Sequence, residues 1–196
     1  APAGAVNLAI PGEVHTGRAA EKDGWTYRMF YLDADLFTKT AAQMTGKKMS
    51  LPFIREGVLF DPSLAGMIHR LHRRMQNSQV SILEKETGLL AVLSCVIRQY
   101  SRPRVTAWPT RHDPDVVKPA RDFIQDRYHR DISIRELAAI TGLSPYHFIR
   151  VFRKQVGLTP HAYLIQVRIQ RARQRLQNGE TPADTALKTG FFDQSH

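Results

Sequence analysis

The segment 146–154 combines aromatic, aliphatic and basic side chains at the spacing of a helix. At about 100° per residue, Tyr146, Ile149 and Arg150 share one face. An arginine near the start of a helix can donate two hydrogen bonds to O6 and N7 of guanine, and tyrosine or isoleucine can contact the methyl group of thymine. These three residues are therefore candidates for contacts to the bases of double-stranded DNA.

Basic residues of the same segment are suited to a different contact. Arg153 lies further along the same face, with His147 and Lys154 on its flank, and all three are candidates for contacts to DNA phosphates. A solvated helix surface would also carry such residues. Ile149 counts against this alternative, because an apolar side chain in the middle of a wet face indicates that a partner covers it.

A pattern that would position such a helix occurs twice, at 133–143 and again 48 positions later at 181–191. Each copy has an N-capping hydroxyl, an acidic residue at the third helical position, a small packing residue and a glycine that ends the helix. This order is typical of the first half of a helix-turn-helix. The matching residues are Ser133, Glu136, Ala138, Thr141, Gly142 and Leu143 in the first copy and Thr181, Asp184, Ala186, Thr189, Gly190 and Phe191 in the second.

A long helix is predicted between the two copies, over 160–177, with Thr159-Pro160 as its start signal and Asn178-Gly179 as its end. A helix of about 18 residues spans about 27 Å. This length is close to the roughly 34 Å between successive major-groove faces on one side of B-DNA, so we expect one chain to read two adjacent segments of major groove. Arg168 is a candidate phosphate contact on this helix, whose arginines could equally be solvated surface.

Composition and charge agree with an anionic partner. The chain of 196 residues has 42% hydrophobic residues, which is ordinary for a globular protein with a core, and a formal net charge of +10. From Lys118 onward, 13 Lys and Arg stand against 7 Asp and Glu, a net charge of +6 that leaves +4 for the longer front part. A basic surface favours nucleic acid, with a merely soluble basic surface as the alternative. The sequence lacks a run of about 18 apolar residues, so no membrane-spanning helix is expected.

The single cysteine, Cys95, lies in the apolar run 89–97. One cysteine excludes a disulfide framework and a multi-cysteine zinc site within this sequence, and it favours a reducing cytosol as the location. We interpret Cys95 as a small buried hydrophobe and not as a reactive thiol.

Residues 1–32 carry short β-like runs broken by turn signals at Pro11-Gly12 and Asp23-Gly24. An isolated hairpin is marginal in water, so we expect these runs to be the last strands of a larger β structure whose other strands precede Ala1. Near the end of the region, large side chains alternate along the chain. They are Trp25, Tyr27, Met29 and Tyr31.

The pattern turns helical over 33–100. One amphipathic helix is expected to begin at 61–63, an Asp-Pro-Ser start signal, and a second is expected over 80–97. Their apolar stripes either pack on the β structure of the same chain or extend to a second subunit. Residues 101–117 contain three prolines and no apolar period, which predicts a linker.

Several strings in 117–196 stand in one recognisable order. They are Glu136-Leu137-Ala138, Gly142-Leu143-Ser144, His147-Phe148-x-Arg150-x-Phe152-Arg153-Lys154, Gly157-Leu158-Thr159-Pro160, then Tyr163 and Arg168, and finally Ala183-Asp184-x-Ala186, Gly190-Phe191 and Asp193-Gln194-Ser195-His196. On these strings the region resembles the AraC/XylS transcription regulators, whose DNA-binding domain carries two helix-turn-helix units joined by one long helix. The resemblance implies that Tyr146, Ile149 and Arg150 match base-reading positions, and that Gln194 and Ser195 match the opening of the second reader. The family pattern continues for about 25 residues more, so we expect the second unit to be cut short at His196.

The strings Ile10-Pro11-Gly12-Glu13-Val14-His15 and Gly24-Trp25-x-Tyr27-Arg28-Met29-x-Tyr31 resemble the last strands of the cupin-type sensor barrel of many family members. This resemblance implies that the barrel binds a small-molecule effector and that the following helices form a homodimer. His15 is then a candidate effector-binding residue. A metal site needs three or four ligands and only Glu13 is nearby, so neither a metal nor another cofactor is expected.

Together these features predict an α+β fold. Residues 1–100 would form an effector-binding and dimerisation domain, with partial cupin-like strands over 1–32 and helices over 33–100. A linker over 101–117 would lead to an all-α DNA-binding domain over 118–196, with two helix-turn-helix units joined by a long helix.

The predicted function is that of a sequence-specific, effector-responsive transcription regulator and not of an enzyme. Activation through contact with RNA polymerase is what the family implies, and repression stays open. One alternative is a cupin-type metal-dependent enzyme or sensor with an accessory DNA-binding module. Another is a DNA-repair protein that pairs such a module with a reactive cysteine, but a single cysteine in an apolar run speaks against it.

Overall fold

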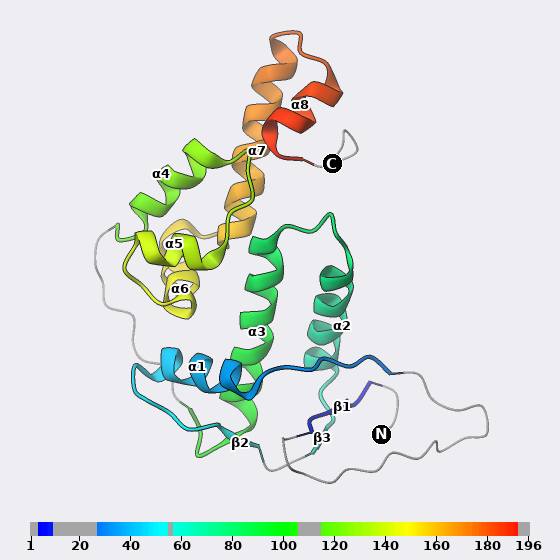
Figure 1. Cartoon of the computed structure of the whole chain (residues 1–196), viewed down its shortest axis with the longest axis vertical. Helices are drawn as coiled ribbons and strands as arrows, with labels where there is room; N and C mark the ends of the chain where they lie inside the picture. The colour runs from blue at the N-terminus through cyan, green and yellow to red at the C-terminus, as the bar shows by residue number, and fades with distance from the viewer. Residues whose placement is uncertain (1–3, 10–26, 55–56, 106–114, 192–196) are drawn as a thin grey trace, which may run out of the picture. The chain divides into compact units, whose positions relative to one another are not determined.

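The chain forms two compact units, each described separately below (Figure 1). The computed structural model describes residues 4–9, 27–54, 57–105 and 115–191. The units consist of Ala1–Gln76 with Leu89–Trp108, and of Asn77–Gly88 with Pro109–His196. Short strands and helices mix in the first unit and helices form the second, which agrees with the predicted α+β class.

The strands of the first unit form two antiparallel pairs. β1 (Val6–Asn7) pairs with β3 (Val58–Leu59), and β2 (Phe53–Ile54) pairs with β4 (Ser101–Arg102). β2 and β3 therefore lie in the region expected to be helical, and β4 lies in the predicted linker. These strands escaped the prediction because each pair joins segments that are distant in sequence.

Residues 27–33 do not form a strand, although the alternation of large side chains predicted one. A strand needs a neighbour that supplies backbone hydrogen bonds, and among the described residues no segment pairs with 27–33. Tyr27, Met29 and Tyr31 are accordingly exposed. Trp25 lies outside the described residues.

The helices of this unit follow local start and stop signals. α1 (Ala34–Thr45) begins where the Asp33 side chain accepts a hydrogen bond from the Asp35 N–H and ends at Gly46, whose φ is 69°. α2 (Pro62–Gln76) and α3 (Ile82–Tyr100) confirm the two predicted amphipathic helices.

Asp61 fixes the start of α2. One carboxylate oxygen accepts hydrogen bonds from the N–H groups of Ser63 at 2.9 Å and Leu64 at 3.0 Å, and the other accepts from the Tyr100 hydroxyl at 2.7 Å. These donors, the Leu64 N–H first among them, hold the pKa of Asp61 below its usual value.

The core of the first unit lies between α2, α3 and the strands. Apolar stripes of both helices pack there on the short strands of their own chain, as one of the two interpretations of these stripes predicted. Cys95 is half-buried beside this core, and burial raises the pKa of its thiol. The buried core residues are Ile54, Leu59, Leu64, Leu71, Val92 and Val96.

In the second unit, α4, α5 and α6 gather at one end of α7, and α8 packs against the other end (Figure 1). The rings of Phe148 and Phe152 lie 5.4 Å apart in the core, and Tyr163 of α7 adds an edge contact 5.6 Å from Phe152. The helices are α4 (Lys118–Arg127), α5 (Ile134–Ile140), α6 (Pro145–Val156), α7 (Pro160–Gln177) and α8 (Pro182–Thr189).

Four of these helices begin at a hydroxyl that accepts a hydrogen bond from the backbone N–H three residues later. Such an N-cap is worth about 1 kcal/mol because it satisfies a donor that the helix leaves unpaired. Cap and donor are Ser133 and Glu136 in α5, Ser144 and His147 in α6, Thr159 and Ala162 in α7, and Thr181 and Asp184 in α8.

A second acceptor at the start of α5 comes from Asn77–Gly88, which belongs to the same unit. The Glu86 carboxylate accepts a hydrogen bond from the Ile134 N–H at 2.7 Å. A negative charge at this end of a helix is favourable, because the helix dipole is positive there. Sequence reasoning missed this contact, which joins residues 48 positions apart.

Candidate nucleic-acid interface

The candidate reading helix, α6, is anchored along one side. Ser144 accepts a hydrogen bond from the His147 N–H at 3.4 Å, and the helix ends at Gly157, whose φ is 79°. Phe148 and Phe152 are completely buried. Because these anchors fix both the ends and the rotation of α6, its opposite face is held outward.

The outward face carries the residues predicted to meet DNA. Tyr146, Ile149 and Arg150 are half-buried on this face, and Arg153 and Lys154 are exposed beyond them. The structure therefore brings the candidate base-reading residues together on one surface of α6, with the candidate phosphate contacts further along.

The Tyr146 ring makes two contacts with side chains at the start of α6. The guanidinium carbon of Arg150 lies 5.5 Å from the centroid of the Tyr146 ring. The rings of Tyr146 and the neighbouring His147 make a T-shaped contact, with the centroids 5.7 Å apart. The three side chains therefore form one group at the first turns of α6.

A tight turn connects α5 to α6. Gly142 adopts a φ of 66°, and the N–H of Leu143 donates to the carbonyl of Ala138 at 3.0 Å. A glycine in the left-handed conformation, followed by a hydrogen bond back across the last turn, is a common way for a helix to end. The glycine at position 142 predicted this end of α5. α5 and α6 thus form a complete helix-turn-helix.

Arg168 does not lie where a phosphate contact requires it. Its side chain is only 6% exposed, and it donates hydrogen bonds to the backbone carbonyls of Tyr128 at 2.7 Å and Arg130 at 3.1 Å. Burial lowers the pKa of its guanidinium. The predicted phosphate contact of Arg168 is therefore wrong, because the side chain is used inside the protein to hold the segment after α4 against α7.

Gly190, at the end of α8, lies against the same segment. Its φ is 81°, and a Cβ at this position would lie 2.7 Å from the carbonyl oxygen of His129 and 2.9 Å from a guanidinium nitrogen of Arg168. Only glycine fits such a conformation and approach. Arg168 of α7 and Gly190 at the end of α8 therefore both lie against the segment between α4 and α5.

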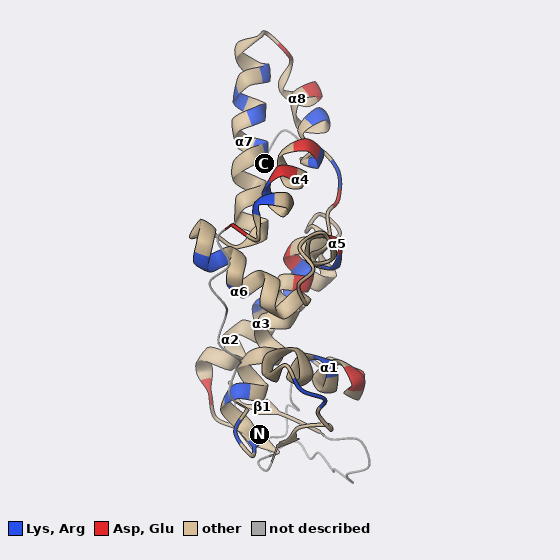
Figure 2. Ribbon diagram, turned by 90° about the vertical axis from the view of Figure 1, so that its left-hand side faces the viewer, with Lys and Arg blue, Asp and Glu red and all other residues tan. Residues whose placement is uncertain are grey.

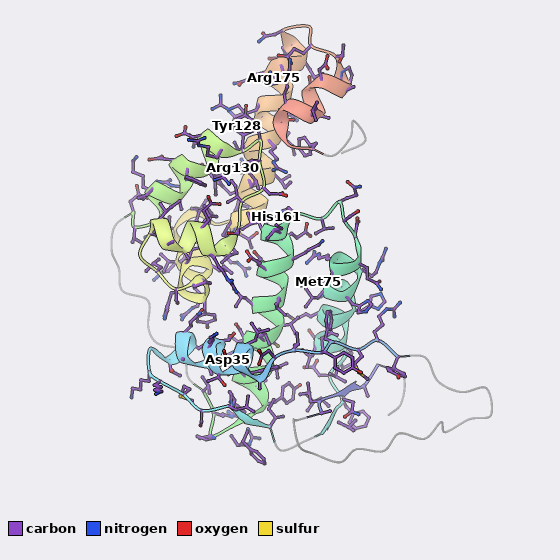
Figure 3. The ribbon with its side chains drawn as sticks, viewed as in Figure 1. Asp35, Met75, Tyr128, Arg130, His161 and Arg175 are labelled. Atoms are coloured by element: carbon purple, nitrogen blue, oxygen red, sulfur yellow. The ribbon has the colours of Figure 1, made fainter. Side chains whose placement is uncertain are left out.

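Further basic residues pair within the unit at the far end of α7 (Figure 3). Glu180 accepts from Arg175 at 2.8 Å and from Lys188 at 2.9 Å, which links α7 to α8. The Lys188 hydrogen bond is the largest of the effects that lower the pKa of Glu180. Arg171 stacks over Tyr128 with its guanidinium carbon 5.6 Å from the ring centroid. Arginine positions nevertheless follow the second half of α7, from Arg168 to Arg175 (Figure 2).

α8 confirms that the second repeat forms a capped helix ended by glycine. Thr185 and Thr189 are buried beside Ala186. Gln194 and Ser195, the candidate opening of the second reader, lie outside the described residues.

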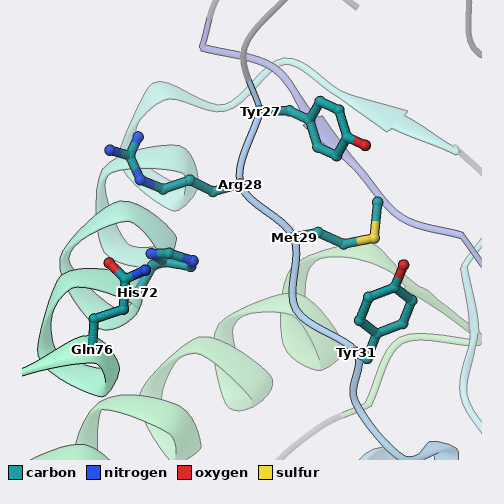
Figure 4. Close-up of a pocket in the computed structure, with 6 residues that line it drawn as sticks. All are labelled: Tyr27, Arg28, Met29, Tyr31, His72 and Gln76. Carbon is teal, nitrogen blue, oxygen red and sulfur yellow. The ribbon is translucent and has the colours of Figure 1, made fainter.

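An open pocket of about 620 Å³ lies in the first unit beside α2 (Figure 4). Arg28 points toward the α2 residues His72 and Gln76, whereas Tyr27, Met29 and Tyr31 extend from the other side of their segment. Nδ1 of His72 is buried and has no hydrogen-bond partner among the described atoms. The α2 residues were missed in the sequence, and His15, the predicted effector contact, lies outside the described residues.

The described residues contain no group of three or more His, Cys, Asp or Glu that could hold a metal ion. None of their helices combines the length and apolar character needed to cross a membrane.

Two family patterns match separate parts of the chain. Residues 137–196 match the helix-turn-helix domain, and residues 1–93 match the AraC-like ligand binding domain. The first match contains α6 and its outward face, and the second contains the pocket beside α2.

Several curated relatives are transcription regulators. The chain is 33% identical over 96% of its length to the uncharacterized HTH-type transcriptional regulator YbfI of Bacillus subtilis (strain 168), of which it covers 68%. It is 36% identical over 38% of its length to the HTH-type transcriptional activator RhaS of Klebsiella pneumoniae (strain 342), of which it covers 27%. It is 31% identical over 38% of its length to the probable transcriptional regulator LumQ of Photobacterium leiognathi, of which it covers 30%.

The fold and the helix-turn-helix define a DNA-binding protein with a second, ligand-binding part. The chain belongs to the AraC family of transcription regulators. The resemblance seen in the sequence is thereby confirmed. These relatives and families are regulators and not enzymes, so the metal-dependent enzyme and the repair protein are set aside.

Proposed function

We propose that the protein is a sequence-specific transcriptional activator that reads DNA through the outward face of α6 and responds to a small-molecule effector. The observation that carries the proposal is the geometry of α6. Complete burial of Phe148 and Phe152 directs Tyr146, Ile149 and Arg150 away from the core. A helix held in this way can enter the major groove with its N-terminal residues against base edges.

The roles of the side chains follow from their positions and chemistry. Ile149 and Arg150 meet base edges, with Tyr146 on the same face, and Arg150 is the residue able to make a bidentate contact to guanine. The phosphate contacts come from His147, Arg153 and Lys154. By family resemblance, Gln194 and Ser195 open the second reader, so that the chain covers two adjacent segments of major groove.

The effector response belongs to the region that matches the ligand-binding domain, 1–93. The side chains at the pocket beside α2 include Arg28 and His72, and the His72 Nδ1 lacks a partner among the described atoms, which supports this pocket as a place for an effector to bind. His15 is a further effector contact that the family resemblance implies. The effector changes DNA binding only if it binds one arrangement of the molecule more tightly than another.

Activation through RNA polymerase, a homodimer and a cytoplasmic location complete the proposal. The relative RhaS is named an activator, which supports activation here. Part of the apolar stripe of α3 would extend to a second subunit. A monomeric mass at micromolar concentration would contradict the homodimer.

Selection of bound duplexes from a random pool tests sequence-specific binding directly. At physiological salt, the selected duplex should bind at least about 1,000-fold more tightly than random duplexes. Equal affinity for the two would refute the proposed function. Transcription from a promoter that carries the selected sequence then tests activation.

A further inference from the structure

Tyr146 and Arg150 form a cation–π pair on the face of α6. They are four residues apart, the spacing at which helix side chains become neighbours. The distance of 5.5 Å between the guanidinium carbon and the ring centroid lies within the range of a cation–π interaction. Both side chains are half-buried, so the pair is partly shielded from water.

The ring of Tyr146 is itself held in place. It lies in the first turn of α6, beside the capped N–H of His147, and it makes a T-shaped contact with the His147 ring at an interplanar angle of 76°. A tyrosine ring has few torsions to fix, whereas a free arginine side chain loses much rotamer freedom when it is ordered. The ring is therefore a platform on which the longer side chain is ordered.

We propose that Tyr146 is a positioning residue, which orients the Arg150 guanidinium for two hydrogen bonds to guanine and so sets base preference through Arg150. The inference rests on the proposed function of α6. It differs from a direct role, in which the Tyr146 ring would contact a thymine methyl and act independently of Arg150.

The chemistry of guanine recognition explains why such a platform matters. The guanidinium is a planar fork, and both of its donors reach O6 and N7 only when the fork lies near the plane of the base. Stacking on the ring limits the planes that the fork can adopt before DNA arrives. Preorganisation of this kind improves binding because less ordering remains to be done in the complex.

A double-mutant cycle tests this coupling. The proteins are the wild type, Tyr146→Leu, Arg150→Ala and the variant with both changes. The affinity of each protein is measured for two duplexes. One is the selected duplex. The other is the same duplex with 7-deazaguanine, which lacks the N7 acceptor, at the position where Arg150→Ala relaxes base preference. The ratio of the two affinities measures guanine recognition.

In the wild type, loss of N7 should weaken binding by about 5- to 100-fold. Tyr146→Leu should reduce that ratio by about 2- to 5-fold in the chain that keeps Arg150 and leave it unchanged in the Arg150→Ala chain. Tyr146→Phe retains the ring and should restore the ratio, because the hydroxyl has no part in the stacking.

Two results would overturn the inference. One is an equal effect of Tyr146→Leu with and without Arg150, which indicates a direct contact. The other is a loss in Tyr146→Phe as large as that in Tyr146→Leu. Failure of the wild type to discriminate the selected duplex would instead refute the proposed function. Circular dichroism checks folding, and Tyr146→Met takes the place of Tyr146→Leu if the latter unfolds.

Discussion

Three arginines of the second unit show how far a residue type alone defines a role. Arg150 is half-buried against an aromatic ring, Arg153 is exposed on the same helix, and Arg168 is buried against backbone carbonyls. The same guanidinium group therefore suits base recognition, phosphate contact or internal support. Burial and partners decide among these roles.

Substitution of the two arginines of α6 should separate base recognition from phosphate contact. Arg150→Ala should cost about 1 to 3 kcal/mol of binding free energy and relax the preference at one base position, whereas Arg153→Ala should weaken all sequences alike. Binding to the selected duplex and to single-base variants measures both effects. Identical preference profiles for the two variants would contradict this division.

Arg168→Met should destabilise the second unit. The change keeps a long side chain but leaves the carbonyls of Tyr128 and Arg130 without their charged donor, which should cost about 2 to 3 kcal/mol. Urea unfolding followed by circular dichroism measures the loss. Arg173→Met, at an exposed position of the same helix, is the matched control and should change stability by less than about 0.5 kcal/mol. If Arg168→Met unfolds like this control, Arg168 has no supporting role.

At the scale of elements, helices and strands differ in how local their determinants are. α6 begins at Ser144 and ends at Gly157 because hydrogen bonds with near neighbours close each end. β2 exists only because β4, far along the chain, pairs with it. Caps and apolar spacing could therefore predict the helices, whereas the strand pairs needed partners that local sequence does not specify.

The start of α2 should give the first unit an acid-sensitive component of stability. The pKa of Asp61 is lower in the folded chain than its ordinary value of 3.8. This contribution is therefore complete above the unfolded pKa and is lost as pH falls through the folded pKa. Thermal unfolding of the wild type and Asp61→Asn, from neutral pH to values below 3.8, should show a stability difference that shrinks as pH falls.

Tyr100→Phe provides a graded comparison for this prediction. It removes one of the donors to Asp61 and keeps the two backbone donors. In Tyr100→Phe, the pH-dependent part of the stability that Asp61 provides should therefore be smaller than in the wild type but still measurable. A difference between wild type and Asp61→Asn that stays constant with pH would show that the ionised carboxylate does not stabilise α2.

For the whole molecule, net charge attracts nucleic acid, and the fold decides which basic residues are available to contact it. The net charge of +10 attracts any nucleic acid, and its excess is concentrated from Lys118 onward. Several basic residues are nevertheless engaged within the protein, as the Arg175 and Lys188 pairs with Glu180 show. The number of phosphate contacts should therefore be much smaller than the number of basic residues.

Salt dependence of DNA binding measures that number. Lys154→Ala should lower the slope of log affinity against log salt concentration by about 1, because one phosphate contact and its released counterion are lost. Lys39→Ala is the control, since Lys39 lies in the first unit and pairs with Asp35 at 2.6 Å. Equal slopes for wild type and Lys154→Ala would remove Lys154 from the phosphate contacts.

Local sequence was enough to predict α2, α3, α7, the repeated capped pattern and the grouping of Tyr146, Ile149 and Arg150 on one face. These features depend on neighbours a few residues apart, which local spacing records. The supporting role of Arg168 and the approach of Gly190 to His129, in contrast, became visible in the folded chain alone. Their partners lie about 40 to 60 positions away in the chain, and such distant contacts form only when the helices pack.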